Sequence, residues 1–422
     1  MDKFIIEGGR PLRGTIAVAG SKNAVLALMP ATLLAPGVYR IRRTPNLRDV
    51  WTMSRLLARL GVHVELSPGG ELFLDTRSIS SFEAPYEHVK KMRASIYVLG
   101  PLLARYGRAR VSLPGGCAFG PRPVDLHLKG MEKLGAEIDV EHGYINARAD
   151  RLRGATIHLD VPSVGATVNI LYAASLAEGE TILTNAAIEP EVTALAQTLV
   201  AMGAQIEGIG TSTLRIRGVP ALTPLEVIEN IPDRIEAATY LIAAAATRGS
   251  VRLVHANPDH LGAVLDKLEE IGCTLDVDGS TISLRCDGEI SPTNVTTAPY
   301  PGFPTDVQAQ WITLMLTARG TSRITETIYP TRFGHVPELR RLGAEIEIAD
   351  STAIVTGGAT LQGATVMSSD LRASASLVLA GLVAEGTTEV LRVYHLDRGY
   401  ERMEERLQQL GGQIVRVPTD EY

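Results

Sequence analysis

Apolar residues along this chain gather into six long runs, and polar and apolar positions alternate between them. The runs cover residues 24–35, 95–104, 166–177, 236–246, 307–318 and 374–384. A helix that is apolar on nearly every side belongs in a protein interior or in a membrane. Because each run falls well short of the roughly 20 residues that span a bilayer, we predict six helices buried inside a globular protein.

Two sets of glycines share one period of roughly 70 residues, which indicates six copies of one unit. The first set follows amphipathic segments: Gly61, Gly135, Gly203, Gly272, Gly343 and Gly411. The second set follows the apolar runs: Gly37, Gly107, Gly179, Gly249, Gly320 and Gly386. We expect the second set to end the buried helices with positive φ. Since β-rich stretches follow both sets, the pattern predicts an α/β fold with mixed sheets: two inside-out α/β domains, each of three repeated βα-type units around buried helices.

Length and composition narrow the class of protein. A chain of 422 residues is too long for one ordinary core, which also favours two domains. The net charge of −6 argues against a nucleic-acid or membrane-surface binder. The three cysteines, Cys117, Cys273 and Cys286, fit neither a disulfide framework nor a zinc site, and a reducing compartment is the natural interpretation. With no signal-peptide pattern at the N-terminus, we expect a cytoplasmic protein with no metal and no organic cofactor.

Basic residues stand just before several of the apolar runs. Lys22, Arg93 and Arg372 occupy predicted helix N-termini, where a cation opposes the helix dipole and an anion is favoured. The alternative interpretation is a set of solvated surface charges. Because the placement recurs at one position of the repeat, we favour anion binding. If the helices of each domain run parallel, their N-termini converge on a cationic cleft.

Two further segments carry residue types that suit catalysis. Residues 113–127 form a loop rich in glycine and proline around Cys117, and Arg122 and His127 are near enough in sequence to make that thiol reactive. An inert cysteine is the alternative. Asp306 precedes the fifth apolar run, where it is either a helix cap or a general base for a hydroxyl group.

Together these segments resemble the UDP-N-acetylglucosamine enolpyruvyl transferases. The resemblance runs from Phe4 to Val415 and rests on motifs at residues 21–24, 92–95, 113–127, 163–167, 304–306, 370–374 and 397–402. It implies two inside-out α/β domains with the active site in the cleft between them. Residues 22–231 would form the domain with the cysteine loop, and residues 1–21 plus 232–422 would form the other.

The resemblance also implies the reaction: transfer of the enolpyruvyl group of phosphoenolpyruvate to the 3-hydroxyl of UDP-N-acetylglucosamine, by addition–elimination with release of phosphate. This is the first committed step of peptidoglycan synthesis. Lys22, Arg122 and Arg398 are implied to hold phosphoenolpyruvate, and Lys22 and Arg398 are implied to be catalytic together with Cys117, a lid cysteine open to fosfomycin, and Asp306, the base. Residues implied to contact the nucleotide sugar are Asn23, Arg93, Arg122, Pro123, Val124, Asp125, Leu126, His127, Ser163, Val164, Gly165, Asp306 and Ile328. Asp370 and Arg372 are implied to support the charged floor.

Two other functions compete with this one. The sister enzyme that acts on shikimate 3-phosphate shares the fold and phosphoenolpyruvate, but the Gly-Gly-Cys loop and the Lys22-Asn23 pair argue against it. A non-catalytic sensor of nucleotide sugars would not need Cys117, Asp306 and Arg398 together. Ile188, Pro330 and Val161-Pro162 depart from the residues frequent in the family at those positions.

Overall fold

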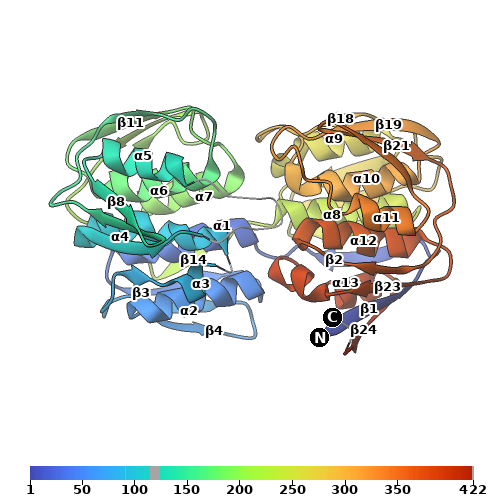
Figure 1. Cartoon of the computed structure of the whole chain (residues 1–422), viewed down its shortest axis with the longest axis horizontal. Helices are drawn as coiled ribbons and strands as arrows, with labels where there is room; N and C mark the ends of the chain where they lie inside the picture. The colour runs from blue at the N-terminus through green and yellow to red at the C-terminus, as the bar shows by residue number, and fades with distance from the viewer. Residues whose placement is uncertain (91, 115–123, 421–422) are drawn as a thin grey trace. The chain divides into compact units, whose positions relative to one another are not determined.

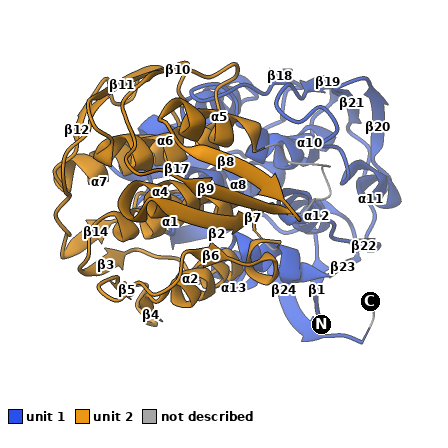
Figure 2. Ribbon diagram, turned by 60° about the vertical axis from the view of Figure 1, so that its left-hand side comes forward, with its two compact units in different colours: residues 1–19, 232–422 blue, residues 20–231 orange. Residues whose placement is uncertain are grey.

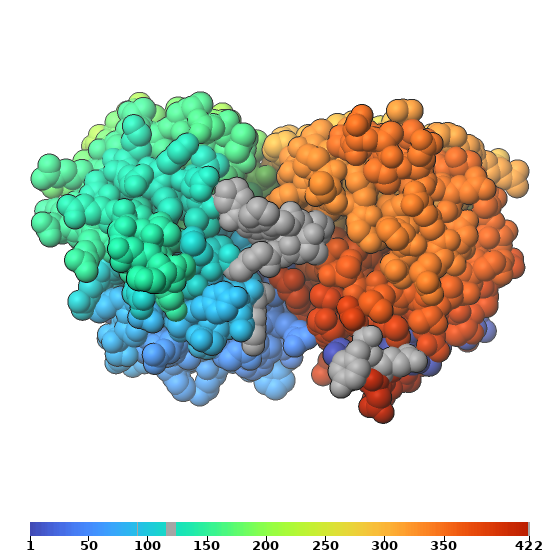
Figure 3. Space-filling view, viewed as in Figure 1, coloured from blue at the N-terminus to red at the C-terminus, as the bar shows by residue number. Residues whose placement is uncertain are grey.

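The computed structural model describes residues 1–90, 92–114 and 124–420, and the others are drawn in grey in Figure 1 and Figure 3. The chain divides into two compact units, shown in separate colours in Figure 2. Unit 1 consists of Met1–Ala19 and Pro232–Tyr422, and unit 2 of Gly20–Ile231. The N-terminal segment therefore completes the unit that the C-terminal half builds.

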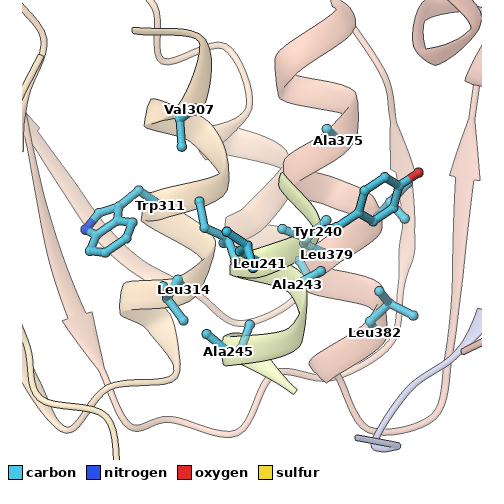
Figure 4. Close-up of a cluster of buried hydrophobic side chains, with 14 of the residues drawn as sticks. Tyr240, Leu241, Ala243, Ala245, Val307, Trp311, Leu314, Ala375, Leu379 and Leu382 are labelled. Atoms are coloured by element: carbon cyan, nitrogen blue, oxygen red, sulfur yellow. The ribbon is translucent and has the colours of Figure 1, made fainter. Parts of the chain in front are cut away.

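Three buried helices form the centre of unit 1. They are α8 (Arg234–Ala246), α10 (Gln308–Leu316), which continues η4 (Thr305–Val307), and α12 (Leu371–Val383). Their side chains pack on one another (Figure 4), and the large side chains of Tyr240 and Trp311 are completely buried in this unit. The prediction of apolar helices in a protein interior is confirmed in this unit.

Unit 2 has the same centre. Its buried helices are α1 (Lys22–Ala31), continued by η1 (Thr32–Leu34); α4 (Leu99–Tyr106), preceded by η2 (Arg93–Val98); and α6 (Val164–Leu176). The Tyr172 hydroxyl of α6 donates to the Ala27 carbonyl of α1, and the Gly100 N–H of α4 donates to Asn169 Oδ1 of α6 at 2.9 Å. Buried polar groups thus pair between the helices instead of facing solvent.

In the described part of the chain, six four-stranded sheets surround the two sets of helices, and each joins one parallel pair to two antiparallel pairs. The mixed sheets predicted from the repeats are confirmed. In unit 2 the sheets are β14 (Val227–Glu229)–β3 (Val38–Arg42)–β5 (Leu72–Asp75)–β4 (His63–Leu66), β6 (Glu83–Ala84)–β7 (Arg108–Ser112)–β9 (Tyr144–Arg148)–β8 (Glu137–Glu141), and β10 (Thr156–His158)–β11 (Glu180–Thr184)–β13 (Thr213–Arg217)–β12 (Gln205–Glu207). In unit 1 they are β16 (Thr274–Asp278)–β17 (Thr281–Arg285)–β15 (Ser250–Val254)–β2 (Arg13–Ala17), β18 (Val295–Thr296)–β19 (Gly320–Thr325)–β21 (Thr352–Gly357)–β20 (Glu345–Ala349), and β22 (Thr365–Met367)–β23 (Thr387–Leu391)–β1 (Asp2–Glu7)–β24 (Gln413–Pro418).

The outer helices carry ordinary polar faces. They are α2 (Arg48–Leu60), α3 (Tyr86–Val89), α5 (Asp125–Lys133) and α7 (Pro190–Ala201) in unit 2, and η3 (Pro258–His260), α9 (Gly262–Glu270), α11 (Val336–Arg341), η5 (Val393–Arg398) and α13 (Met403–Gln409) in unit 1. Each glycine of the first set follows one of these helices with φ between 85° and 106°. Among the helices that the structure describes, none combines the length and the apolar character that a membrane span requires.

The second glycine set only partly follows our expectation. Four members have positive φ, but Gly37 and Gly249 do not, so the prediction is wrong for these two. A Cβ at Gly37 would lie 2.3 Å from Pro224 Cβ, and one at Gly249 would lie 2.1 Å from the Leu12 carbonyl oxygen. These two glycines are needed because another segment passes too close for a side chain.

Candidate functional site

Asp306 lies at the start of a buried helix of unit 1, between two guanidinium groups. Arg332 Nη1 is 2.9 Å from Asp306 Oδ1, and Arg372 Nη2 is 3.5 Å from Asp306 Oδ2. Arg372 belongs to the first turn of α12, so the N-terminal ends of α10 and α12 meet here. The cap positions of η4 and α10 are occupied by Pro304 and Val307, and Asp306 lies inside η4. The capping interpretation of Asp306 is therefore wrong, and the ion-pair geometry keeps a carboxylate available for chemistry.

Arg372 is buried, with 4% of its surface exposed. Burial alone would lower its pKa, but the phenol group of Tyr400 and the carboxylates of Asp306 and Asp233 raise the pKa above its ordinary value. The guanidinium carbon lies 5.4 Å from the Tyr400 ring centre, over its face. Asp370 caps α12 by accepting from the Arg372 N–H at 3.0 Å and the Ala373 N–H at 3.1 Å. A permanently charged Arg372 is thus fixed beneath Asp306.

A buried polar network joins the third helix to this pair. The Tyr400 hydroxyl lies 2.8 Å from Thr239 Oγ1 of α8, and Gln310 Nε2 of α10 donates to it at 3.3 Å. Gln310 Nε2 also lies 3.1 Å from Thr239 Oγ1 and 2.9 Å from the Asp306 carbonyl. The predicted convergence of helix N-termini is therefore confirmed for the three buried helices of unit 1.

Lys22 begins α1 in unit 2 and is only 8% exposed. Its ammonium group lies 2.8 Å from Asp49 Oδ2 of α2. Ser21 caps the helix by accepting from the Ala24 N–H at 3.2 Å, and Asn23 is half-buried. Lys22 is therefore held in place by a buried carboxylate and is not the solvated surface charge of the alternative interpretation.

His127 lies in the first turn of α5 and is 2% exposed. Burial, together with the nearby charge of Arg93, lowers its pKa to about 3. The Asn169 amide lies 2.8 Å from His127 Nδ1 and donates to it in the neutral ring, which leaves the proton on Nε2. A Cβ on Gly165 would come within 2.8 Å of His127 Cε1. The structure thus brings together Arg93, His127 and Gly165 from three motifs that are far apart in sequence.

The remaining predicted site residues lie mostly at the ends of helices and differ in burial. Ser163 caps α6 by accepting from the Ala166 N–H at 3.2 Å, and Val164 begins that helix. Val124 is buried and Asp125 exposed at the start of α5, and Leu126 is half-buried. Arg398 ends η5 half-buried, and Ile328 is half-buried between β19 and α11. The predicted site residues outside the described part of the chain are Cys117, Arg122 and Pro123.

Sequence reasoning missed the residues that orient the predicted ones. Asp49, Asn169 and Arg332 do not belong to any motif that we assigned a role. Tyr400 lies inside the motif at residues 397–402, which is the one signal that pointed toward it. Each of these four residues contacts a predicted site residue that is distant in sequence. The spacing of residues along the chain therefore does not reveal the contact.

Metal-binding clusters and cavities are the other features of the described residues that could indicate a functional site. No cluster of three or more histidine, cysteine or acidic side chains with metal-binding geometry occurs among them. A surface cavity of about 660 Å³ lies in unit 1 and is lined by Ala246, Leu316 and Val383, at the C-terminal ends of the buried helices. We place the candidate site at the opposite, N-terminal ends, because the ionisable side chains converge there.

Comparisons with known proteins add independent information. The family model described as EPSP synthase (3-phosphoshikimate 1-carboxyvinyltransferase) matches residues 6–407. A curated protein of Chlorobium phaeovibrioides named UDP-N-acetylglucosamine 1-carboxyvinyltransferase is 57% identical over 425 residues, with 100% of both chains covered. A protein of the same name from Desulfosudis oleivorans is 54% identical, with 99% of this chain and 100% of the relative covered.

Solved structures agree with the fold described above. The enolpyruvyl transferase NikO from Streptomyces tendae superimposes with a TM-score of 0.89 at 27% identity, covering 99% of each chain. An EPSP synthase from Acinetobacter baumannii superimposes with a TM-score of 0.75 at 18% identity, covering 99% of this chain and 100% of its own. The second similarity concerns the fold alone.

Proposed function

Because this chain belongs to the family of UDP-N-acetylglucosamine 1-carboxyvinyltransferases, we propose that it transfers the enolpyruvyl group of phosphoenolpyruvate to the 3-hydroxyl of UDP-N-acetylglucosamine. The observation that carries this proposal is identity of 54% to 57% along essentially the whole chain to curated relatives of that name. The proposal places the protein at the first committed step of peptidoglycan synthesis. Free thiols at Cys273 and Cys286 are in keeping with work in the reducing cytoplasm.

The reaction is an addition followed by an elimination. The sugar 3-hydroxyl loses its proton and attacks C2 of phosphoenolpyruvate while C3 gains a proton, which gives a tetrahedral adduct. Loss of a proton from C3 and of phosphate from C2 then forms the enol ether. We propose Asp306 as the base for the hydroxyl, because its carboxylate lies at the helix start beside two cations, with Arg332 at 2.9 Å and Arg372 at 3.5 Å.

Phosphoenolpyruvate carries a phosphate and a carboxylate, so its binding requires several cations. We propose that Lys22, Arg122 and Arg398 supply them. Lys22 already has a buried carboxylate partner in Asp49, and a bound phosphate would share this ammonium group. Cys117 is our candidate for proton delivery or product release.

We propose that the nucleotide sugar is bound by the remaining predicted residues. His127 is neutral and donates through Nε2, so it can contribute a directional hydrogen bond but no charge. Charge for the diphosphate would come from Arg93 and Arg122. The other residues of the proposed set are Asn23, Pro123, Val124, Asp125, Leu126, Ser163, Val164, Gly165 and Ile328, with Asp370 and Arg372 in support.

The test is phosphate release from phosphoenolpyruvate, measured in parallel with UDP-N-acetylglucosamine and with shikimate 3-phosphate. We expect release only with the nucleotide sugar, and its loss by a factor of about 100 or more in Asp306→Asn. Glu347→Gln, an exposed carboxylate of the same unit, serves as the control variant. Release only with shikimate 3-phosphate would overturn the acceptor, and nucleotide-sugar binding without release would favour the sensor.

A further inference from the structure

Glu326 is a fully buried carboxylate that none of the motifs above includes. It directly follows β19, at the point where the parallel strands β18 and β19 end side by side, and none of its surface is exposed. A buried charge is costly unless hydrogen bonds or opposite charges compensate for it. The groups around Glu326 therefore show what the carboxylate holds in place.

One oxygen of Glu326 fixes the turn that leads to Arg332. Glu326 Oε1 accepts from Thr297 Oγ1 at 2.8 Å, from the Ile328 N–H at 2.9 Å and from the Tyr329 N–H at 3.0 Å. Thr297 Oγ1 in turn accepts from the Thr327 N–H at 2.9 Å. The backbone on either side of Ile328 is thus tied to the end of β18.

The other oxygen of Glu326 fixes the residue before Asp306. Glu326 Oε2 accepts from Thr305 Oγ1 at 2.9 Å, and Thr305 Oγ1 accepts from Arg332 Nη1 at 2.9 Å. A carboxylate can only accept and a guanidinium can only donate, so the direction of both hydrogen bonds is determined. The same Arg332 nitrogen lies 2.9 Å from Asp306 Oδ1. Its two hydrogens are therefore shared between Thr305 and Asp306.

We propose that Glu326 is a positioning residue for Asp306. It orients the Thr305 hydroxyl as an acceptor for Arg332, and this fixes Arg332 on the face of Asp306 that it neutralises. Asp306 is the base of the reaction proposed above, and the consequence for turnover rests on that proposed function. The geometric part of the proposal is that Glu326 and Thr305 determine the Arg332–Asp306 contact. This part rests on the distances in this structure and does not depend on the proposed reaction.

The most selective test changes Thr305, because its hydroxyl bridges Glu326 Oε2 and Arg332 Nη1 directly. Thr305→Val removes the hydroxyl with almost no change in shape, whereas Thr305→Ser keeps it. We expect kcat for phosphate release to fall about 10- to 100-fold in Thr305→Val and to stay within about threefold of the parent value in Thr305→Ser. The KM for phosphoenolpyruvate should stay unchanged, because Thr305 is not among the residues proposed to hold that substrate.

Glu326→Gln provides a second test. Its amide oxygen can still accept from the backbone N–H groups, but its NH₂ group would face Thr305 and force that hydroxyl to accept from it. The Thr305 proton then loses the carboxylate acceptor that turns it away from Arg332, so we expect a loss of kcat similar to that of Thr305→Val. Glu289→Gln, which removes an exposed carboxylate of the same unit, is the matched control and should keep the parent kcat.

Parent kcat in both Thr305→Val and Glu326→Gln would overturn the proposal, as would equal losses in Thr305→Val and Thr305→Ser. A crystal structure of Thr305→Val gives a readout that does not depend on activity. We expect Arg332 Nη1 to leave Asp306 Oδ1, and an unchanged contact would contradict the inference. If the parent protein released no phosphate, the proposed function would fail, while this structural comparison would still decide the role of Glu326.

Discussion

Glu236, in the first turn of α8, determines how the stability of unit 1 responds to pH. It is 2% exposed, and its Oε2 accepts from the Ala19 N–H at 2.6 Å. Burial raises its pKa to about 7 and outweighs the lowering by Arg406, whose Nε lies 3.7 Å from Glu236 Oε1. The carboxylates of Asp233 and Glu401 add to the rise, and the Ala19 N–H opposes it.

A raised carboxyl pKa costs stability as the pH increases. The unfolded chain ionises Glu236 near pH 4.5, whereas the folded chain does so near pH 7. Stability contributed by the protonated form is therefore complete below about pH 4.5 and is lost progressively up to about pH 7. Once Glu236 is ionised in the folded protein, above about pH 7, the free energy of unfolding is lower by about 3 kcal/mol.

Glu236→Gln removes this titration and keeps an oxygen that can accept from the Ala19 N–H. We expect the variant to exceed the parent by about 1 kcal/mol near pH 5 and by up to about 3 kcal/mol at pH 8. Urea unfolding followed by tryptophan fluorescence measures the difference. Trp311 is buried in unit 1, and Trp51→Phe removes the second tryptophan of the chain, so the signal reports on unit 1.

The same measurement on the exposed Glu347→Gln controls for the loss of one carboxylate. Its stability difference from the parent should not vary between pH 5 and pH 8. A parent that is more stable than Glu236→Gln at pH 8 would mean that the ion pair with Arg406 outweighs burial. That result, or a difference that does not change with pH, would refute the reasoning.

Three further predictions follow from single contacts. Gly165→Ala should raise the KM for the nucleotide sugar about tenfold, because the new Cβ would lie 2.8 Å from His127 Cε1; an unchanged KM would argue against a role for the imidazole. Cys273 and Cys286 stand opposite each other one residue beyond the Thr274–Arg285 pair of β16 and β17, so the thiol oxidant diamide should join them in a disulfide worth about 3 kcal/mol. Peptide mapping without this cross-link would contradict the pairing. Cys117→Asp should keep substantial activity and lose sensitivity to fosfomycin, because a carboxylic acid can deliver a proton but resists alkylation by the epoxide; equal inactivation of both proteins would rule this out.

The repeat pattern predicted most of the fold because its signals are local. A helix without a polar face must be buried whatever surrounds it, and the six buried helices were found where the apolar runs predicted them. Gly37 and Gly249 departed from expectation because their constraint comes from Pro224 and Leu12, which are distant in sequence. Local pattern therefore predicts the elements, and the contacts between them require the folded chain.

The same division holds at the candidate site. Lys22, Asp306 and Arg372 were recognisable because each stands where a helix begins. Glu326 was not recognisable from the sequence, because its proposed role depends on a hydrogen bond of 2.9 Å with Thr305, 21 residues away. His127 was identified by its motif, but the position of its ring proton depends on a hydrogen bond with Asn169, 42 residues away.

The central claim is that this chain joins an enolpyruvyl group to the sugar O3 of UDP-N-acetylglucosamine. Product analysis by NMR, after incubation with both substrates, tests it most directly. We predict two vinyl protons on a new enol ether whose carbon couples to the sugar proton at C3, with one phosphate released for each product formed. Phosphate and pyruvate with an unmodified nucleotide sugar, or an enol ether at another oxygen, would contradict the account.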